Sequence, residues 1–145
     1  MRYLIFFTIL LLSYPVYAKS FGNYEGAIYL QNYDGDTIRF NLPDYPPIVG
    51  NDIRVRLNGI DTPEIKGKCK KEKYEAQQAR DMVADILKGA EKITLVNMKR
   101  GKYFRIAADI IVDGKNLGDM LIEAGMAIKY HGGKKSNKWC DTTNE

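Results

Sequence analysis

Several short segments of this chain alternate apolar with polar residues, as strands do when one face is buried and the other is solvated. The clearest is Ile53–Ile60, in which Ile53, Val55 and Leu57 share one face and polar residues occupy the other. Four further segments show a looser form of the same pattern. Together they predict five strands, at Tyr24–Tyr33, Thr37–Leu42, Ile53–Ile60, Ile93–Val96 and Arg105–Val112.

Two other segments repeat apolar residues at helical spacing. Tyr74–Lys88 carries an apolar stripe and is followed by Gly89, which is typical of a helix end. Asn116–Ala124 begins with an asparagine suited to cap free backbone N–H groups, and Gly125 follows it. The stripe of the first helix consists of Ala76, Ala79, Val83, Ile86 and Leu87.

The order of these elements indicates the fold class. The first two strands flank Asp34-Gly35-Asp36 and form a β-hairpin, and the loop Pro43–Asp52 leads to the third strand. One helix follows the third strand and another follows the fifth, which is not the strict alternation of βαβ units. We expect an α+β, mainly β fold, a five-stranded Greek-key barrel of the OB type with two helices.

Residues 1–18 have the layout of a secretory signal peptide. Arg2 precedes an apolar run from Tyr3 to Leu12, and the small residues Val16 and Ala18 suit a signal peptidase. The run is too short for a membrane span, which needs roughly 20 apolar residues. We therefore expect cleavage near Ala18 and an exported, periplasmic or secreted domain at 19–145.

The chain is mildly basic, with 22 Lys and Arg against 18 Asp and Glu. This charge excludes little, but basic residues gather in two stretches, Lys66–Lys73 and Lys99–Arg105. A polyanionic partner would suit both stretches, but on charge alone two solvated loops are the favoured interpretation.

The chain contains two cysteines, Cys69 and Cys140. In an exported protein an even number of cysteines indicates a disulfide. A bridge closing the long loop between these two cysteines would stabilise the fold by roughly 4 kcal/mol. A single histidine disfavours a Cys/His zinc site.

Four carboxylates follow the ends of strands that can converge in a small barrel: Asp34, Asp36, Asp61 and Glu64. Carboxylates gathered in one place repel one another unless a cation lies among them, and oxygen ligands suit Ca²⁺ or Mg²⁺. An EF-hand is excluded, because Tyr45 stands at the twelfth position of a loop opened at Asp34.

Two arginines, Arg56 and Arg105, add the cations that bind phosphate oxygens. Carboxylates, a hard cation and two arginines are together the components of phosphoryl chemistry. Taken singly, however, each residue favours an ordinary turn aspartate or an exposed strand arginine, and only the full set is balanced between the two interpretations. The residues alone leave both interpretations open.

Three segments resemble the signatures of the thermonuclease, or staphylococcal nuclease-like, family. They are Asp34-Gly35-Asp36-Thr37, then Arg56–Glu64 with the letters RLNGIDTPE, then Lys102–Arg105 with the letters KYFR. Their order and spacing also match, and the resemblance covers roughly Tyr24 to Tyr130. The Ile-Asp-Thr-Pro-Glu segment with its preceding arginine is the specific part.

The resemblance implies a Ca²⁺ site. Asp36 and Asp61 would ligate the ion through their carboxylates and Thr62 through its backbone carbonyl, with Asp34 close behind them. Family members hydrolyse DNA and RNA endonucleolytically, breaking the bond from phosphorus to the 5′-oxygen and leaving 3′-phosphate ends.

The resemblance also implies the remaining roles. Glu64 would orient or deprotonate the attacking water, and Arg56 and Arg105 would bind the scissile phosphate. Tyr103 would line the nucleotide pocket, and Tyr130 lies near the position of a second pocket tyrosine. His131 is a less favoured catalytic base, because Glu64 already fills that role.

The chain departs from the family pattern in three places. Phe104 stands where a glycine is common, which puts the reach of Arg105 in question, and Pro43–Asp52 is a longer loop than usual. The sequence ends at Glu145 without a full C-terminal third helix. We expect a Cys69–Cys140 bridge to fasten the C-terminal segment in place of that helix.

Two other function classes fit parts of the sequence. The first is a non-catalytic nucleic-acid-binding module, because OB-type barrels commonly bind single strands. The second is an envelope protein with a purely structural Ca²⁺ site, which would leave Arg56, Glu64 and Arg105 unused. We expect a monomeric enzyme acting on DNA and RNA.

Overall fold

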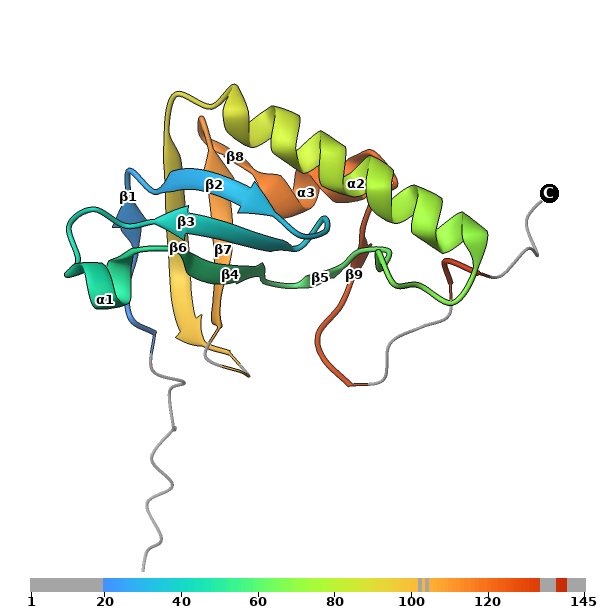
Figure 1. Ribbon diagram of the computed structural model, residues 1–145, viewed down its shortest axis with the longest axis horizontal. Coiled ribbons are helices and arrows are strands. Elements are labelled where there is room, and N and C mark those ends of the chain that lie inside the picture. The colour runs from blue at the N-terminus through green and yellow to red at the C-terminus, as the bar shows by residue number, and fades with distance from the viewer. Residues whose placement is uncertain (1–19, 102, 104, 134–137, 141–145) are drawn as a thin grey trace, which may run out of the picture.

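The computed structural model describes residues 20–101, 103, 105–133 and 138–140 (Figure 1). Their strands form a curled sheet with a long helix packed against it. The strands are β1 (Tyr24–Glu25), β2 (Ile28–Asn32), β3 (Thr37–Asn41), β4 (Ile53–Leu57), β5 (Ile60–Asp61), β6 (Ile93–Arg100), β7 (Ile106–Val112), β8 (Lys115–Asn116) and β9 (Ile128–Lys129). The helices are α1 (Pro47–Gly50), α2 (Lys70–Lys88) and α3 (Leu117–Glu123).

The strand order of the main sheet is β1-β6-β7-β4-β3-β2, with β8 added beside β7. The neighbours are antiparallel except for β4 and β7, which are parallel. β1 and β2 lie at opposite ends of this order, yet only Gly26 and Ala27 separate them in the chain. The sheet must therefore curl until its two ends approach, which confirms the predicted α+β, mainly β architecture of the OB type.

The core lies on the inner face of the curled sheet. Ile38 and Phe40 of β3, Val55 of β4 and Ile110 of β7 have no exposed surface. The helix α2 lies across this core beside β2 (Figure 1). It contributes an apolar stripe to the core. Its buried apolar residues are Ala76, Ala79, Val83 and Leu87, all members of the predicted stripe.

The five long strands β2, β3, β4, β6 and β7 correspond to the five predicted strands. The bounds of β3 and β7 agree with the prediction to within one residue, and the other three strands differ by more. The first predicted strand is interrupted at Gly26, with φ +78°, and the third at Gly59, with φ +72°. The strand predicted to end at Val96 continues to Arg100 as β6. The prediction stopped early because a bulge, with Asn97 at φ +54°, breaks the alternation of apolar and polar residues there.

The prediction of two helices omitted the short helix α1, which lies in the expected loop Pro43–Asp52. Pro47 begins it, and the fixed φ of proline suits a first helical turn. The helix α2 begins at Lys70, four residues before the predicted Tyr74. The predicted start was late because the first turn is charged and shows no apolar periodicity.

The helix α3 lies within its predicted range, and the predicted cap is present. Asn116 accepts hydrogen bonds from the backbone N–H groups of Gly118 and Asp119. Among the described residues beyond α3 there is no further helix.

The predicted signal peptide, residues 1–18, lies outside the described residues. Within the described part, no helix is both long enough and apolar enough to cross a membrane.

Candidate active site

The turn between β2 and β3 brings two aspartates into the interior. Asp34 Oδ1 accepts hydrogen bonds from the backbone N–H groups of Asp36, at 3.1 Å, and Thr37, at 2.8 Å. A Cβ added to Gly35 would lie 2.9 Å from Thr62 Cγ2 and 3.0 Å from Ala79 Cβ. A glycine at position 35 therefore lets the turn pack directly on the segment after β5 and on α2, and this contact fixes Asp34 and Asp36 beside Thr62.

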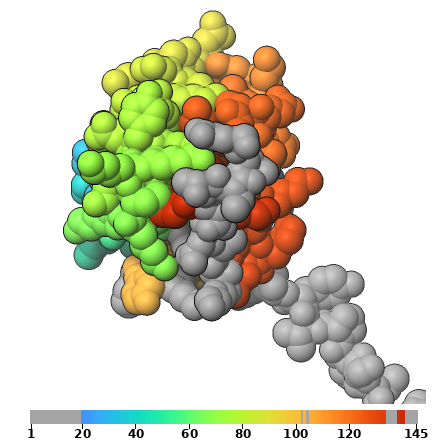
Figure 2. Space-filling model, turned by 90° about the vertical axis from the view of Figure 1, so that its right-hand side faces the viewer, coloured from blue at the N-terminus to red at the C-terminus, as the bar shows by residue number. Residues whose placement is uncertain are grey.

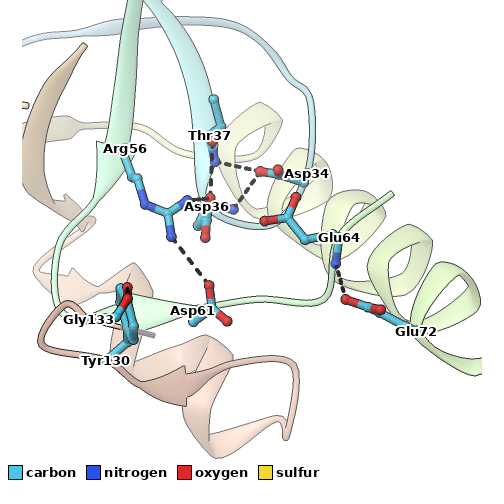
Figure 3. A network of polar contacts seen from close by, with 9 residues as sticks. All are labelled: Asp34, Asp36, Thr37, Arg56, Asp61, Glu64, Glu72, Tyr130 and Gly133. Atoms are coloured by element: carbon cyan, nitrogen blue, oxygen red, sulfur yellow. Dashed lines mark hydrogen bonds and ion pairs between the residues drawn. The ribbon is translucent and has the colours of Figure 1, made fainter. Parts of the chain in front are cut away.

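Arg56 connects the two aspartates that the sequence assigns to a metal. From β4 its guanidinium forms an ion pair with Asp36, and its Nη2 lies 3.4 Å from Asp61 Oδ1 (Figure 3). Asp36 is 1% exposed and Asp61 2% exposed, and Thr37 Oγ1 donates to Asp36 Oδ1 at 3.0 Å. Two nearly buried carboxylates thus share one partly buried guanidinium.

This arrangement suits a hard cation. Asp34, Asp36 and Asp61 bring three buried carboxylates to one region, beside the guanidinium of Arg56. Figure 3 shows these side chains and Glu64 directed toward a common space. Carboxylate oxygens are ligands that Ca²⁺ and Mg²⁺ prefer, and Thr62, 1% exposed, can add a backbone carbonyl.

A second group of metal-binding residue types lies at the start of α2. Donor atoms of Cys69, Glu72 and Cys140 lie within 4.8 Å of one another. The two sulfurs are joined in a disulfide and offer no thiolate, so we assign no metal to this group. The carboxylates of the candidate site do not form such a tight trio, and a cation there would also require carbonyl and water ligands.

Glu64 lies on a short turn whose backbone is bound by a buried glutamate. Glu72, on the first turn of α2, accepts hydrogen bonds from the N–H of Glu64 at 3.4 Å and of Lys68 at 2.8 Å. Gly67 N–H closes the turn by donating to the Glu64 carbonyl at 2.8 Å. A Cβ on Gly67 would lie 2.4 Å from Glu72 Cδ, so the turn folds tightly around this carboxylate.

Two adjoining hollows meet at the predicted catalytic side chains. Arg56, Glu64 and Arg105 line a hollow of about 480 Å³ together with Tyr130. The same three side chains also line a hollow of about 560 Å³ over β3 and β4. Arg105 thus reaches the region of Glu64 and Arg56, although Phe104 lies outside the described residues.

The predicted nucleotide-binding residues lie in different surroundings. Tyr130 borders the smaller hollow, and its hydroxyl donates to the Gly133 carbonyl at 2.7 Å (Figure 3). Tyr103 is 84% exposed, with the Arg105 guanidinium 5.8 Å from its ring centre. His131 is exposed and does not line either hollow of Glu64.

A disulfide joins Cys69, which caps α2, to Cys140 near the end of the chain. Figure 2 shows the segment 138–140 in red between α2 in green and the orange segment that follows α3. The Cys140 sulfur lies 3.5 Å from Glu72 Oε2. The bridge therefore places the C-terminal segment beside the carboxylate that binds the Glu64 turn.

The sequence interpretation missed the position of Glu72. A signal was present, because Cys69-Lys70-Lys71-Glu72 has the spacing of a capping box, in which a glutamate at the third helical position returns to the backbone before the helix. The late predicted start of α2 removed Glu72 from consideration.

Fold and site together define a class: an OB-type barrel with a buried acidic cluster and two arginines beside adjoining hollows. Comparison with protein families places the chain within that class. The family described as staphylococcal nuclease homologue matches residues 54–143, more than half of the sequence. The chain belongs to this family, which is one of nucleases acting on nucleic acids. No curated protein matches the chain.

Proposed function

We propose that this chain is an exported, Ca²⁺-dependent endonuclease that hydrolyses phosphodiester bonds in DNA and RNA. The observation that carries the proposal is the meeting of Arg56, Glu64 and Arg105 at one hollow. The buried Asp36 and Asp61 form ion pairs with Arg56, which lines this hollow.

The cation would be held by the carboxylates of Asp36 and Asp61 and the carbonyl of Thr62, with Asp34 orienting the turn. When bound, Ca²⁺ supplies an electrophile that polarises a phosphate oxygen and favours deprotonation of water. The acidic cluster supports a cation of this kind, because three buried carboxylates lie in one region and carboxylate oxygens are the ligands that a hard cation prefers.

The protein side chains perform the remaining chemistry. Glu64 accepts the proton of the attacking water, whose oxygen forms a bond to phosphorus. Arg56 and Arg105 donate hydrogen bonds to the non-bridging oxygens, where negative charge increases in the five-coordinate transition state. The bond from phosphorus to the 5′-oxygen breaks, the 5′-oxygen takes up a proton from solvent, and Glu64 returns its proton to solvent. The other fragment keeps a 3′-phosphate.

The test is cleavage of single-stranded DNA and of RNA by the purified protein, with Ca²⁺ and then with excess chelator. We expect Ca²⁺-dependent cleavage with 3′-phosphate ends and a loss of about 100-fold or more in Glu64→Gln. Glu123→Gln, an exposed position on α3, is the matched control. Full activity in Glu64→Gln would contradict the proposal, and binding without cleavage would favour a non-catalytic module.

Export is tested separately. The pattern of residues 1–18 and the disulfide both fit an oxidising compartment outside the cytoplasm. Mass spectrometry of the protein from the extracytoplasmic fraction should find an N-terminus near Lys19. An intact N-terminus at Met1 would contradict export by signal cleavage.

A further inference from the structure

The outer face of β3 and β4 carries two arginines that the proposed chemistry does not use. Arg39 and Arg54 are direct cross-strand partners, and the next pair on the same face of these two strands is Thr37 and Arg56. Like charges directly opposite each other destabilise a sheet. Their juxtaposition therefore needs a compensating anion.

The protein supplies only part of that compensation. Arg39 donates two hydrogen bonds to the Asp52 carboxylate, and these hydrogen bonds raise the pKa of its guanidinium. Arg54 is exposed and has no hydrogen bond or ion pair with another described residue. One guanidinium of the pair thus faces solvent without an anion.

Both arginines border the same hollow as the proposed catalytic residues. The hollow of about 560 Å³ over β3 and β4 is lined by Arg39 and Arg54 as well as by Arg56, Glu64 and Arg105. The hollow that contains Tyr130 lies at the same three catalytic side chains. If Arg56 and Arg105 bind the scissile phosphate, the two hollows lie beside it. Each hollow could then hold one of the two phosphates that flank the scissile one along the strand.

The spacing of the arginines fits a polynucleotide. Arg54 and Arg56 are two residues apart on β4, which corresponds to roughly 6.6 Å along a strand. Successive phosphates of an extended nucleic-acid strand have a similar separation. Tyr33, 50% exposed, borders the same hollow and offers an aromatic face on which a base can stack.

We infer that Arg39 and Arg54 form a subsite for the phosphate adjacent to the scissile one on a single-stranded polynucleotide. This inference rests on the proposed function, since it takes Arg56 as a ligand of the scissile phosphate. With this subsite, the chain would bind a nucleic-acid strand on both sides of the cleaved bond, as an endonuclease requires.

The first test is the salt dependence of binding of a short oligothymidylate to the Glu64→Gln protein. For a single strand, the slope of log affinity against log salt becomes shallower by about 0.7 for each phosphate that the protein no longer neutralises. Adding Arg54→Gln should reduce the slope by that amount and weaken binding about tenfold. Lys115→Gln, which removes an exposed charge on β8, should change neither the slope nor the affinity by a comparable amount.

A second variant is designed to strengthen oligothymidylate binding rather than weaken it. Asp52 has φ +56°, a conformation that asparagine also tolerates, so Asp52→Asn should keep the fold while releasing Arg39 from its ion pair. This variant should bind the oligothymidylate about threefold to tenfold more tightly. Circular dichroism spectra of all variants should match that of the parent protein.

The third test uses otherwise wild-type protein and substrates of two lengths. Arg54→Gln should leave kcat/KM for a dinucleoside monophosphate unchanged, because this substrate has only the scissile phosphate. It should lower kcat/KM for a longer oligonucleotide about tenfold.

The outcomes separate this inference from the proposed function. An unchanged salt slope in Arg54→Gln, with cleavage intact, would overturn the subsite and leave the nuclease standing. The expected slopes without any cleavage would overturn the nuclease and keep a nucleic-acid-binding site here. Equal losses on both substrates would show that Arg54 acts on the scissile phosphate and would also overturn the subsite.

Discussion

The two sides of the candidate site differ in how firmly the fold holds them. On the acidic side, Asp36, Asp61 and Thr62 are at most 2% exposed, and the turn that carries Glu64 is bound to Glu72 by two hydrogen bonds. On the basic side, Arg54 is exposed and Tyr103 is 84% exposed. The aspartates are fixed by burial and Glu64 by the contacts of its turn, whereas Arg54 and Tyr103 project into solvent and Arg39 and Arg105 are half-buried.

This difference corresponds to the two tasks of the proposed enzyme. Cation ligands and a water-orienting carboxylate act only in a fixed geometry, because a small misplacement removes most of their effect. Groups that bind a flexible polymer can adjust to it, and exposure keeps them available. Arg56 belongs to both sides, since it contacts Asp36 and Asp61 and also borders both hollows.

Arg56→Gln should have the largest effect, because it acts on both sides. Removing a donor to the transition-state phosphate should lower kcat by about 100-fold to 1,000-fold. The same change removes a positive charge from beside two carboxylates. In the absence of nucleic acid it should therefore strengthen Ca²⁺ binding, by about fivefold, as measured by titration calorimetry.

Measuring both kcat and Ca²⁺ affinity distinguishes a bridging role of Arg56 from simple loss of folding. A misfolded variant would lose Ca²⁺ binding and activity together, so weaker Ca²⁺ binding would contradict a bridging role for Arg56. The matched control is Arg54→Gln, which removes a guanidinium from the same strand without contacting either aspartate. It should leave the Ca²⁺ affinity unchanged.

Gly67→Ala and Glu72→Ala test the support of the acidic side. The added Cβ of Gly67→Ala would meet Glu72 Cδ at 2.4 Å and displace the carboxylate from the turn. Either change should lower kcat by about 10-fold to 100-fold while KM for a long oligonucleotide changes little, because only Glu64 is displaced. Steady-state kinetics on single-stranded DNA measures both constants.

Glu72→Gln is the informative control for this support. Its amide keeps one acceptor oxygen where the carboxylate has two, so kcat should recover to a value between those of Glu72→Ala and the wild type. A loss in Glu72→Gln as large as that in Glu72→Ala would point to the charge of Glu72 rather than its hydrogen bonds. A rise in KM as large as the fall in kcat, in any of these variants, would contradict a specific effect on Glu64.

Sequence patterns predicted the parts of this molecule that depend on neighbours in the chain. The alternation of Ile53–Leu57 and the turn at Asp34-Gly35-Asp36 are local properties, and both elements occur where expected. The bulge at Asn97 could not be predicted, because a single left-handed residue breaks the alternation without interrupting the strand. β6 was consequently predicted too short.

The candidate site shows the same division. The segment from Arg56 to Glu64 supplied most of the proposed residues from a single motif. The contact of Gly35 with Thr62 and Ala79, by contrast, joins three separate elements and depends on how they pack. The cross-strand pair of Arg39 and Arg54 likewise depends on the register of two strands, which alternation alone does not determine.

Removing the disulfide should affect the acidic side less than displacing Glu72 does. Cys69→Ser with Cys140→Ser should lower the free energy of unfolding by about 2–5 kcal/mol, because the unfolded chain regains the freedom of a long closed loop. Glu72 still lies on α2 and can bind the turn, so kcat below the unfolding transition should fall only a few fold. Urea titration and steady-state kinetics measure the two effects. A loss of kcat as large as that in Glu72→Ala would show that the bridge itself positions Glu64.

Tyr103→Ala should have the smallest effect, because it removes an exposed group from the basic side. Its ring lies near the Arg105 guanidinium and can stack with a base, and removing this aromatic face should raise KM about fivefold with little change in kcat. Tyr103→Phe keeps the aromatic face and should restore the wild-type KM. The matched control is Tyr74→Ala, which removes a 66% exposed tyrosine from α2 and should leave KM unchanged. A fall in kcat without a rise in KM would place Tyr103 with the fixed acidic groups and would contradict the division between the two sides.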